Sequence, residues 1–381
     1  MPSRPDFHFT PPLNWMNDPN GLIYHEGLYH VYYQHNPLAN EFGNISWGHA
    51  TSRDLKTWNH HEVALRFTAE AMIYSGCTVR DRAGNICAIY TEHLGDTEDY
   101  QERICLARSH DGGFSFDQEE RQIILERQEN DFRDPKVFWY EAGQYWVMCV
   151  ALPKQYTILF YRSTDLYSWT PSGEFTSSEP HGQFWECPDL FPLLDEAGQE
   201  TWVLTLSGQN SDGQSWGMFY FVGFFDGHAF QAQGPSMVLD HGSDFYAGVT
   251  FEGLNERVML GWAGNWAYAG QLSEGTFSGV MAIPRKLSLH KGMLYQELIS
   301  DLEAIPLEVK LEPQKLGIEN CSLEWRSNGL TIDRSNSPRK FPETYRVVNF
   351  EGKIQQLHLW KDNGIWELSI NDGQQMMTVR V

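Results

Sequence analysis

The chain has 381 residues, in which 50 Asp and Glu outnumber 28 Lys and Arg to give a net charge of −22. A negative field of this size repels nucleic acids and anionic membrane surfaces, so the composition argues against both as partners. No apolar run approaches the roughly 18 residues of a membrane-spanning helix, and the first residues lack the apolar stretch of a signal peptide. We therefore expect a cytoplasmic protein, although a secreted chain whose leader had been replaced by Met1 would look the same.

Cysteines and histidines show no pattern of metal ligands. The six cysteines include no C-x-x-C pair, and most lie in apolar runs that predict buried free thiols. The 14 histidines form no set with metal-ligand spacing. The chain also lacks a P-loop, a G-x-G-x-x-G sequence and a G-x-S-x-G sequence. We therefore expect neither a metal nor a cofactor.

Short β-rich segments separated by turns make up the first 300 residues, and helical periodicity is nearly absent. The clearest strands are 28–33, 86–90, 145–150, 201–206 and 258–262, which follow turns at Gly27, Gly84, Gly143, Gly198 and Asn255. These turns are spaced by 57, 59, 55 and 57 residues. An all-β repeat of this length is typical of four-stranded propeller blades, so we predict a five-bladed β-propeller over residues 1–298.

A second repeated sequence is predicted to be structural. Residues 52–58 and 163–169 share the pattern S-x-D-L-x-x-W. Aspartate in this position turns the chain by accepting hydrogen bonds from the backbone just after it. We therefore interpret Asp54 and Asp165 as turn residues.

Residues at one phase of a propeller repeat should meet in space, because the innermost strand of every blade lines the axis. Nine residues before each turn stand Asp18, Ser75, Asp134, Asp189 and Tyr246. Aspartate is disfavoured inside ordinary strands, so three carboxylates at one phase are hard to explain as solvated surface. The sequence thus predicts a ring of acids around the hub.

The repeat stops after about residue 296, although β-rich segments continue. Asn371-Asp372-Gly373 is a strong hairpin signal between two of them. We predict a second, smaller β-sandwich-like domain over residues 299–381. Its completeness as a sandwich is left open.

Unusual local sequences surround the acids. They are Asn14–Gly21 (NWMNDPNG), Phe132–Lys136 (FRDPK) and Trp185–Phe191 (WECPDLF). Each alone has a structural alternative, such as an Asx turn in the first segment and a surface ion pair in the second. In the third, a Glu between Trp and Cys with Pro two residues on is not typical of a solvated face. Together, at one phase of a five-fold repeat, the three segments indicate a functional site.

These three segments resemble the defining motifs of glycoside hydrolase family 32, the β-fructofuranosidases, and the resemblance extends from Phe7 to Val381. Further matches are residues 33–37, 47–50, 75–76, 244–247 and 261–266. The sequence departs from the family at residues 74–77, where Tyr-Ser-Gly-Cys replaces Phe-Ser-Gly-Ser. The resemblance implies a five-bladed propeller with a C-terminal β-sandwich, and an enzyme that hydrolyses O-glycosyl bonds with retention of configuration.

Carried over by motif, the resemblance implies that Asp18 is the nucleophile, Glu186 the acid/base and Asp134 the stabiliser of the transition state. It also implies that the substrate is contacted by Trp15, Asn17, Gln34, Trp47, Ser75, Arg133, Asp189, Trp262 and Trp266. For the last two tryptophans, core packing is an equal alternative. We expect Arg133 to keep Asp134 ionised. Like-charge repulsion from Asp134 and Asp189 is expected to raise the pKa of Glu186.

The favoured function is release of terminal non-reducing β-D-fructofuranosyl residues from sucrose, fructo-oligosaccharides and fructans. A fructosyltransferase on the same scaffold would share the covalent intermediate, so the sequence does not separate the two. A non-catalytic sugar-binding propeller should have lost an acid, and all three are present. A small sugar or oligosaccharide is the expected partner; the preference among sucrose, inulin-type and levan-type chains and the oligomeric state are left open.

Overall fold

The structure, a computed structural model, describes residues 4–95, 99–128, 130–177, 184–209, 216–272, 275–299, 302–310, 312–318, 320–350 and 352–381. These residues form 30 strands and two three-residue 3-10 helices, η1 (Pro153–Gln155) and η2 (Ala269–Gln271). Within the described ranges, no helix is long and apolar enough to cross a membrane. The prediction of an all-β fold is confirmed.

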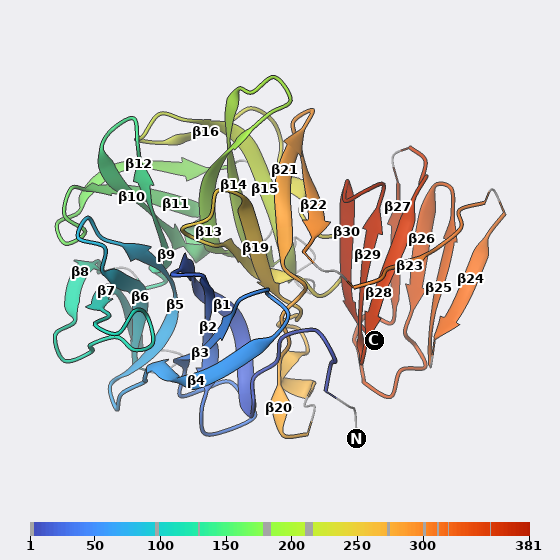
Figure 1. The fold of residues 1–381 in the computed structure, drawn as a ribbon, viewed down its shortest axis with the longest axis horizontal. Coiled ribbons are helices and arrows are strands. Elements are labelled where there is room, and N and C mark those ends of the chain that lie inside the picture. Colours follow the sequence, from blue (N-terminus) through green and yellow to red (C-terminus); the bar gives the residue numbers. More distant parts are fainter. Residues whose placement is uncertain are drawn as a thin grey trace.

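Five antiparallel sheets follow one another along the chain and surround a common axis, which confirms the five-bladed propeller (Figure 1). The blades are β1 (Asn14–His25), β2 (Leu28–Asn36), β3 (Ser46–Ser52) and β4 (Trp58–Leu65); β5 (Ala71–Arg80), β6 (Ile86–Gly95), β7 (Tyr100–Arg108) and β8 (Gln122–Glu126); β9 (Arg133–Tyr140), β10 (Tyr145–Leu152), β11 (Thr157–Ser163) and β12 (Thr170–Thr176); β13 (Phe184–Leu194), β14 (Glu200–Gln209), β15 (Trp216–Phe225) and β16 (Phe230–Ala232); and β18 (Tyr246–Thr250), β19 (Arg257–Trp262), β21 (Arg285–His290) and β22 (Met293–Leu298). Two short strands extend these sheets, β17 (Met237–Val238) beside β15 and β20 (Phe277–Ser278) parallel to β1.

The first strand of each blade forms the hub. β1, β5, β9, β13 and β18 contact one another in a closed ring around the axis. The second strands, β2, β6, β10, β14 and β19, begin one or two residues after the five predicted turns. The periodicity of the turns therefore located the blades correctly, because each blade is one supersecondary unit of similar length.

Every hub strand is interrupted by a β-bulge at the same height. Two residues of the hub strand oppose one residue of its neighbour at Asn17-Asp18, Tyr74-Ser75, Asp134-Pro135, Cys187-Pro188 and Ala247-Gly248. A bulge bends the strand and re-aims the side chains next to it. Three of these bulges contain a non-glycine residue with positive φ: Asp134 at 62°, Cys187 at 48° and Ala247 at 52°. In blades 1 to 3, the bulges contain polar residues, among them Asp18, Ser75 and Asp134.

The repeated S-x-D-L-x-x-W sequences form turns, as predicted. Asp54 Oδ1 accepts hydrogen bonds from the backbone N–H groups of Lys56 and Thr57 at 2.9 and 2.8 Å. Asp165 holds the equivalent turn in blade 3 through the backbone of residues 167 and 168. Backbone hydrogen bonds to both carboxylates favour their ionised forms and lower their pKa values.

Apolar side chains pack between neighbouring blades and hold the hub strands in place. Between blades 3 and 4, for example, Val147 and Phe160 pack in one buried cluster with Trp185, Leu204 and Phe221. Burial of aromatic rings of this size contributes about 2–3 kcal/mol each. Contacts between blades therefore help to hold the hub strands in place, in addition to the contacts of the hub strands with one another.

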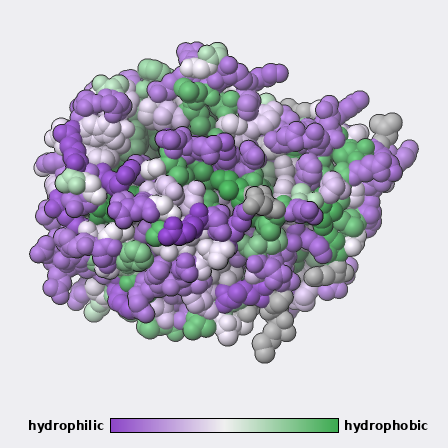
Figure 2. Space-filling view, viewed as in Figure 1, coloured by the Kyte–Doolittle hydropathy of each residue, from purple (hydrophilic) through white to green (hydrophobic). Residues whose placement is uncertain are grey.

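The residues after the propeller form two stacked four-stranded sheets, which gives the predicted β-sandwich (Figure 1). One sheet contains β23 (Ile305–Pro306), β28 (Leu357–Asp362), β29 (Ile365–Ile370) and β30 (Gln375–Arg380); the other contains β24 (Gln314–Ile318), β25 (Cys321–Arg326), β26 (Gly329–Asp333) and β27 (Tyr345–Asn349). Figure 2 shows hydrophilic residues over most of the visible face of both domains, with hydrophobic residues gathered near the middle of the molecule and on the sandwich.

Buried charges fasten the sandwich to the propeller. Arg285 of blade 5 is fully buried and donates to Asp240 at 2.8 Å and to Glu367 of the sandwich at 3.0 Å. At the other end of the chain, Asp362 accepts hydrogen bonds from the backbone N–H groups of residues 6–8. The ring of His8 lies between Asp362 and Glu367, at 2.9 and 3.1 Å. The segment before β1 is therefore anchored on the sandwich.

Candidate active site

A cavity of about 450 Å³ opens at the hub. Its lining includes eight of the twelve residues predicted for the site: Asn17, Asp18, Gln34, Ser75, Arg133, Asp134, Glu186 and Trp266. The three predicted acids come from different blades, on β1, β9 and β13. Acids up to 168 positions apart in sequence therefore share one cavity, as expected for a propeller hub.

The Asp18 carboxylate is held by three donors. Asn17 donates to its Oδ1 at 2.9 Å, and Ser75 donates to its Oδ2 at 3.0 Å. The Cys187 thiol also contacts Oδ2, at 3.7 Å. Burial raises the pKa of Asp18 to about 6, assisted by the nearby charge of Glu186 and opposed by the donors of Asn17, Ser75 and Cys187. Asp18 is therefore oriented for attack and ionised at neutral pH.

Asp134 occupies the floor of the cavity beside Asp18. Its Oδ2 accepts from the backbone N–H of Cys187 at 2.9 Å, and its own N–H donates to Thr91 Oγ1 at 3.0 Å. Burial raises the pKa of Asp134, and the charge of Arg133 opposes this only in part. The expectation that Arg133 keeps Asp134 ionised was therefore wrong: Arg133 lowers the pKa of Asp134, but burial raises it by more.

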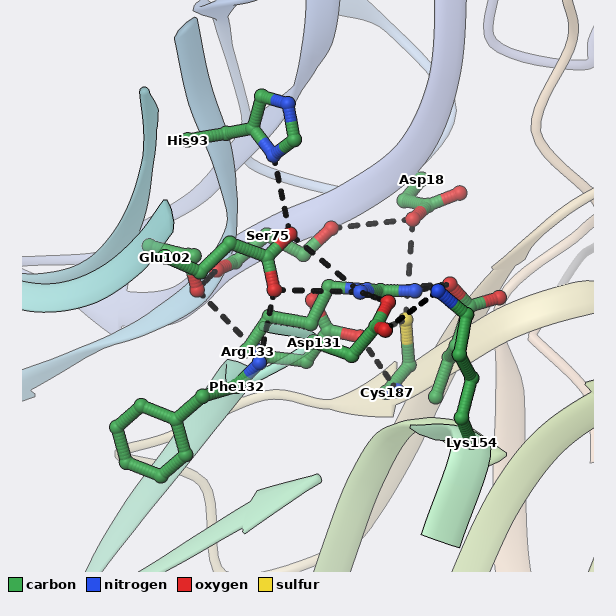
Figure 3. A network of polar contacts seen from close by, with 12 residues as sticks. Asp18, Ser75, His93, Glu102, Asp131, Phe132, Arg133, Lys154 and Cys187 are labelled. Carbon is green, nitrogen blue, oxygen red and sulfur yellow. Dashed lines mark hydrogen bonds and ion pairs between the residues drawn. The ribbon is translucent and has the colours of Figure 1, made fainter. Parts of the chain in front are cut away.

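The Arg133 guanidinium instead binds three other carboxylates, and Figure 3 shows those of Glu102 and Asp131 beside it. Its Nη2 and Nε donate to Glu186 Oε1 at 2.9 and 3.3 Å. Its Nη1 donates to Asp131 at 3.0 Å and to Glu102 at 3.2 Å. The second oxygen of Glu186 accepts a hydrogen bond from the Tyr246 hydroxyl at 2.6 Å. The candidate proton donor is thus fixed from both sides.

Four residues predicted to contact the substrate lie behind the cavity wall. Trp15, Trp47, Asp189 and Trp262 are almost completely buried and are not part of the lining. Trp15 donates from its indole to Asn17 Oδ1 at 2.7 Å, and Trp47 donates to the carbonyl of Tyr74 at 3.0 Å. Trp262 packs against Trp266, with ring centroids 5.1 Å apart. The three tryptophans support lining residues, which corrects the prediction of direct contact.

Asp189 belongs to a buried ion pair below the cavity. Its Oδ2 accepts from Thr250 N–H and Oγ1 at 2.6 and 2.8 Å and lies 3.2 Å from Lys136 Nζ. These groups join β9, β13 and β18 across the axis. Because Lys136 neutralises it, Asp189 is not a free charge that acts on Glu186, contrary to our expectation.

Several lining residues were missed by the sequence analysis. They are Phe42, Met72, Tyr74, His93, Tyr100, Glu102, Asp131, Lys154 and Phe184. Glu102 and Tyr100 lie on β7, the third strand of blade 2, which a search of hub strands does not reach. One signal was available: Glu102 shares a strand face with the buried Ile104 and Leu106, where a charge is unusual.

Comparisons with known proteins assign the family. The family model for the N-terminal domain of glycosyl hydrolases family 32 matches residues 8–297. The chain is 40% identical over 308 residues to a levanase of Bacillus subtilis, which covers 75% of this chain and 45% of the levanase. It is 36% identical over 336 residues to an extracellular exo-inulinase of Aspergillus niger, which covers 76% of this chain and 62% of that enzyme. The chain belongs to glycosyl hydrolase family 32.

The solved structures agree in fold. A fructofuranosidase from Schwanniomyces occidentalis complexed with fructosylnystose superimposes with a TM-score of 0.89 at 27% identity, covering 100% of this chain and 91% of that one. Invertase 1 of Saccharomyces cerevisiae is 32% identical over 411 residues, covering 98% of this chain and 75% of the invertase. The chain thus spans about half the length of the levanase and three quarters of the invertase.

Proposed function

We propose that the protein is a retaining β-fructofuranosidase that releases terminal, non-reducing β-D-fructofuranosyl units from sucrose and fructans. The observation that carries this proposal is the meeting of Asp18, Asp134 and Glu186 in one hub cavity. Levanase, exo-inulinase and invertase are the names of the relatives at 32–40% identity. A non-catalytic sugar-binding role is disfavoured because all three acids are present and share the cavity.

The proposed chemistry is a double displacement. The ionised Asp18 carboxylate attacks the anomeric carbon of the terminal fructosyl unit, while Glu186 protonates the leaving oxygen. A water molecule, deprotonated by Glu186, then attacks the same carbon and releases Asp18. Asp134 lies beside Asp18 and can accept hydrogen bonds from sugar hydroxyls, which strengthen as positive charge develops on the ring.

Aromatic side chains in the cavity lining support a sugar substrate. The rings of Trp266 and Phe42 lie in the lining, 5.6 Å apart between centroids, and offer apolar faces to a second sugar.

A product assay tests this proposal. Fructose release is measured from sucrose, sucrose 6-phosphate, kestose, inulin and levan at equal enzyme concentration, and the first anomer formed is identified by NMR. We expect turnover of the neutral substrates, β-fructose as the first anomer and no turnover by Asp18→Ala. Asp165→Ala, which removes an exposed turn aspartate outside the cavity, is the matched control and should remain active. Initial α-fructose, or substantial turnover by Asp18→Ala, would refute the mechanism.

We also propose that the protein works in the cytoplasm, where thiols remain reduced. This is supported by its six cysteines, all of which are free and buried. The matching exo-inulinases are named as extracellular, so the two possibilities are distinct. Fractionation of the source cells tests the proposal, and recovery of the active protein from the medium would overturn it.

A further inference from the structure

The guanidinium of Arg133 binds one carboxylate that must carry a proton in the proposed reaction and two others that need not. Arg133 binds Glu186 through Nη2 and Nε, and it binds Glu102 and Asp131 through Nη1 (Figure 3). Arg133, Glu102 and Asp131 are all more than nine-tenths buried. Charges at such sites are poorly screened by solvent, so each one acts strongly on its neighbours.

Two hydrogen-bond donors hold Glu186, one at each carboxylate oxygen. Arg133 donates to one oxygen and the Tyr246 hydroxyl donates to the other. Donors to both oxygens stabilise a carboxylate against protonation. In the proposed reaction, however, Glu186 must hold a proton when the substrate binds. Some neighbouring negative charge has to offset the guanidinium.

Glu102 supplies a fixed negative charge on the far side of Arg133. Both of its oxygens lie within 3.4 Å of Arg133 Nη1, and it also accepts from the backbone N–H of Phe132 at 2.8 Å. His93 Nδ1 lies 3.1 Å from Glu102 Oε1, and its ring stacks between Tyr74 and Tyr100. Burial alone would raise the pKa of Glu102, but Arg133 and His93 outweigh it and lower the pKa.

We propose that Glu102 is a positioning residue that offsets the charge of Arg133, so that Glu186 can keep the proton it donates to the leaving sugar. The inference rests on the proposed function for the identity of that proton transfer. Glu102 does not need to touch the substrate, because it acts through the guanidinium. It lies on β7 and reaches the hub from the third strand of its blade.

The other charged groups around this pair do not replace Glu102. Asp131 shares Arg133 Nη1, but its second oxygen binds Lys154 Nζ at 2.7 Å, so much of its charge is already paired. On the hub side, Asp18 of β1 and Asp134 of β9 face Glu186, and each interacts with its charge. In the proposed reaction, Asp18 forms a bond to the sugar and Asp134 faces the positive charge that develops on the ring, so the surroundings of both carboxylates change. Among the described residues, the charged partners of Glu102 are Arg133 and His93, and neither reacts in the proposed mechanism, so Glu102 gives a constant offset.

The test is the pH profile of kcat/KM for sucrose. The alkaline limb reports loss of the proton from the acid of the free enzyme. Glu102→Gln removes the offsetting charge, which leaves Arg133 to favour ionised Glu186, so this limb should move to lower pH by about one unit. Glu102→Asp keeps the charge and should restore the limb to its wild-type position.

Glu92→Gln is the matched control. Glu92 is a buried glutamate in the same blade, it lies outside the cavity lining, and it is paired with Arg103 at 2.6 Å and with Arg121. Its loss should lower stability without moving the alkaline limb. A limb that stays at its wild-type pH in Glu102→Gln would overturn the inference, whatever the loss in plateau rate.

A second variant and a second readout keep the test independent of folding and of turnover. If Glu102→Gln does not fold, Asp131→Asn removes the other acid on Nη1 and should move the limb in the same direction by a smaller amount, because Lys154 already pairs much of the Asp131 charge. Titration of Glu186 is also followed by NMR in protein labelled with [δ-¹³C]glutamate, the resonance being assigned by its absence in Glu186→Gln. A wild-type protein without fructosidase activity would overturn the proposed function, while an unshifted NMR titration in Glu102→Gln would overturn this inference alone.

Discussion

The hydroxyl of Ser75 sets the lower end of the working pH range. Ser75 on β5 donates to Asp18 Oδ2 at 3.0 Å, and Asp18 has a pKa raised to about 6. A hydrogen bond to a charged group contributes about 1.5 kcal/mol, which corresponds to about one pKa unit. Ser75→Ala removes a bond that only the ionised form accepts. The pKa of Asp18 should therefore rise toward about 7.

The sign of the change follows from the role of Asp18. A nucleophile must be ionised, so kcat/KM falls as the pH drops through its pKa. The acid limb of the profile should move from about pH 6 to about pH 7 in Ser75→Ala. At pH 5 the variant would then lose about tenfold in kcat/KM beyond any loss at its plateau.

Thr78→Ala is the control for this variant. Thr78 lies three residues further along β5 and donates to the Gly21 carbonyl of β1 at 2.7 Å. It therefore joins the same two strands as Ser75 does, without touching an acid. Steady-state rates with sucrose are measured from pH 4 to pH 8 for both variants. An acid limb that moves equally in both, or in neither, would refute the assignment of Ser75 to Asp18.

Three further outcomes follow from buried groups. Asp189→Ala leaves the Lys136 ammonium without its counter-charge. The free energy of unfolding, measured by urea denaturation, should fall by about 3–5 kcal/mol, with KM for sucrose unchanged. A raised KM without loss of stability would show instead that Asp189 contacts the sugar. Burial lowers the pKa of His30 to about 4, so only the unfolded chain gains this proton as the pH falls below 6.5, and stability should drop by about 3 kcal/mol between pH 7 and pH 4. The drop should be smaller in His30→Gln, and an equal drop would assign it to other groups. Trp15→Phe removes the donor that orients Asn17, and kcat/KM for sucrose should fall about tenfold with little change in the thermal midpoint.

The blades, Asp18 and Asp134 could be predicted from the sequence because they recur at a regular spacing, whereas Glu186 was predicted from the resemblance of its local sequence to a family motif. Each blade repeats the same hairpins, so its turns recur at a nearly constant interval. The local sequences around Asp18, Asp134 and Glu186 then identified the chemistry. Residues such as Asp18 and Asp134 can be predicted because they stand in an unusual local sequence and at a fixed interval from a turn.

The drift of the bulges explains why Asp189 was misplaced. A step of nine residues back from the turn falls on the bulge in blades 1 to 3, at Asp18, Ser75 and Asp134. In blade 4 it falls one residue beyond the bulge, at Asp189, and in blade 5 one residue before it, at Tyr246. Asp189 lies outside the bulge, where the regular pairing of β13 with β14 has resumed, and its carboxylate binds Lys136 and Thr250 outside the cavity lining.

Partners of long side chains were not predictable in the same way. Arg133 stands next to Asp134 in sequence, yet its guanidinium reaches Glu186, Glu102 and Asp131. The carboxylates that the guanidinium binds depend on how three blades are placed around the axis, and this placement cannot be inferred from neighbours in the sequence. Glu102 was missed for the same reason, because it enters the hub from an outer strand.

The anchoring of residues 6–8 on the sandwich has a consequence for synthesis on the ribosome. Their partners, Asp362 and Glu367, emerge more than 350 residues later, so this segment waits unbound through most of translation. The strand that carries Asp18 follows directly, and β20, which pairs with it on the edge opposite β2, emerges only with residues 277–278. The sheet of blade 1 therefore cannot be completed before residues 277–278 are made, and a premature stop before Asp362 would leave residues 6–8 without these partners and loosen the strand that carries Asp18.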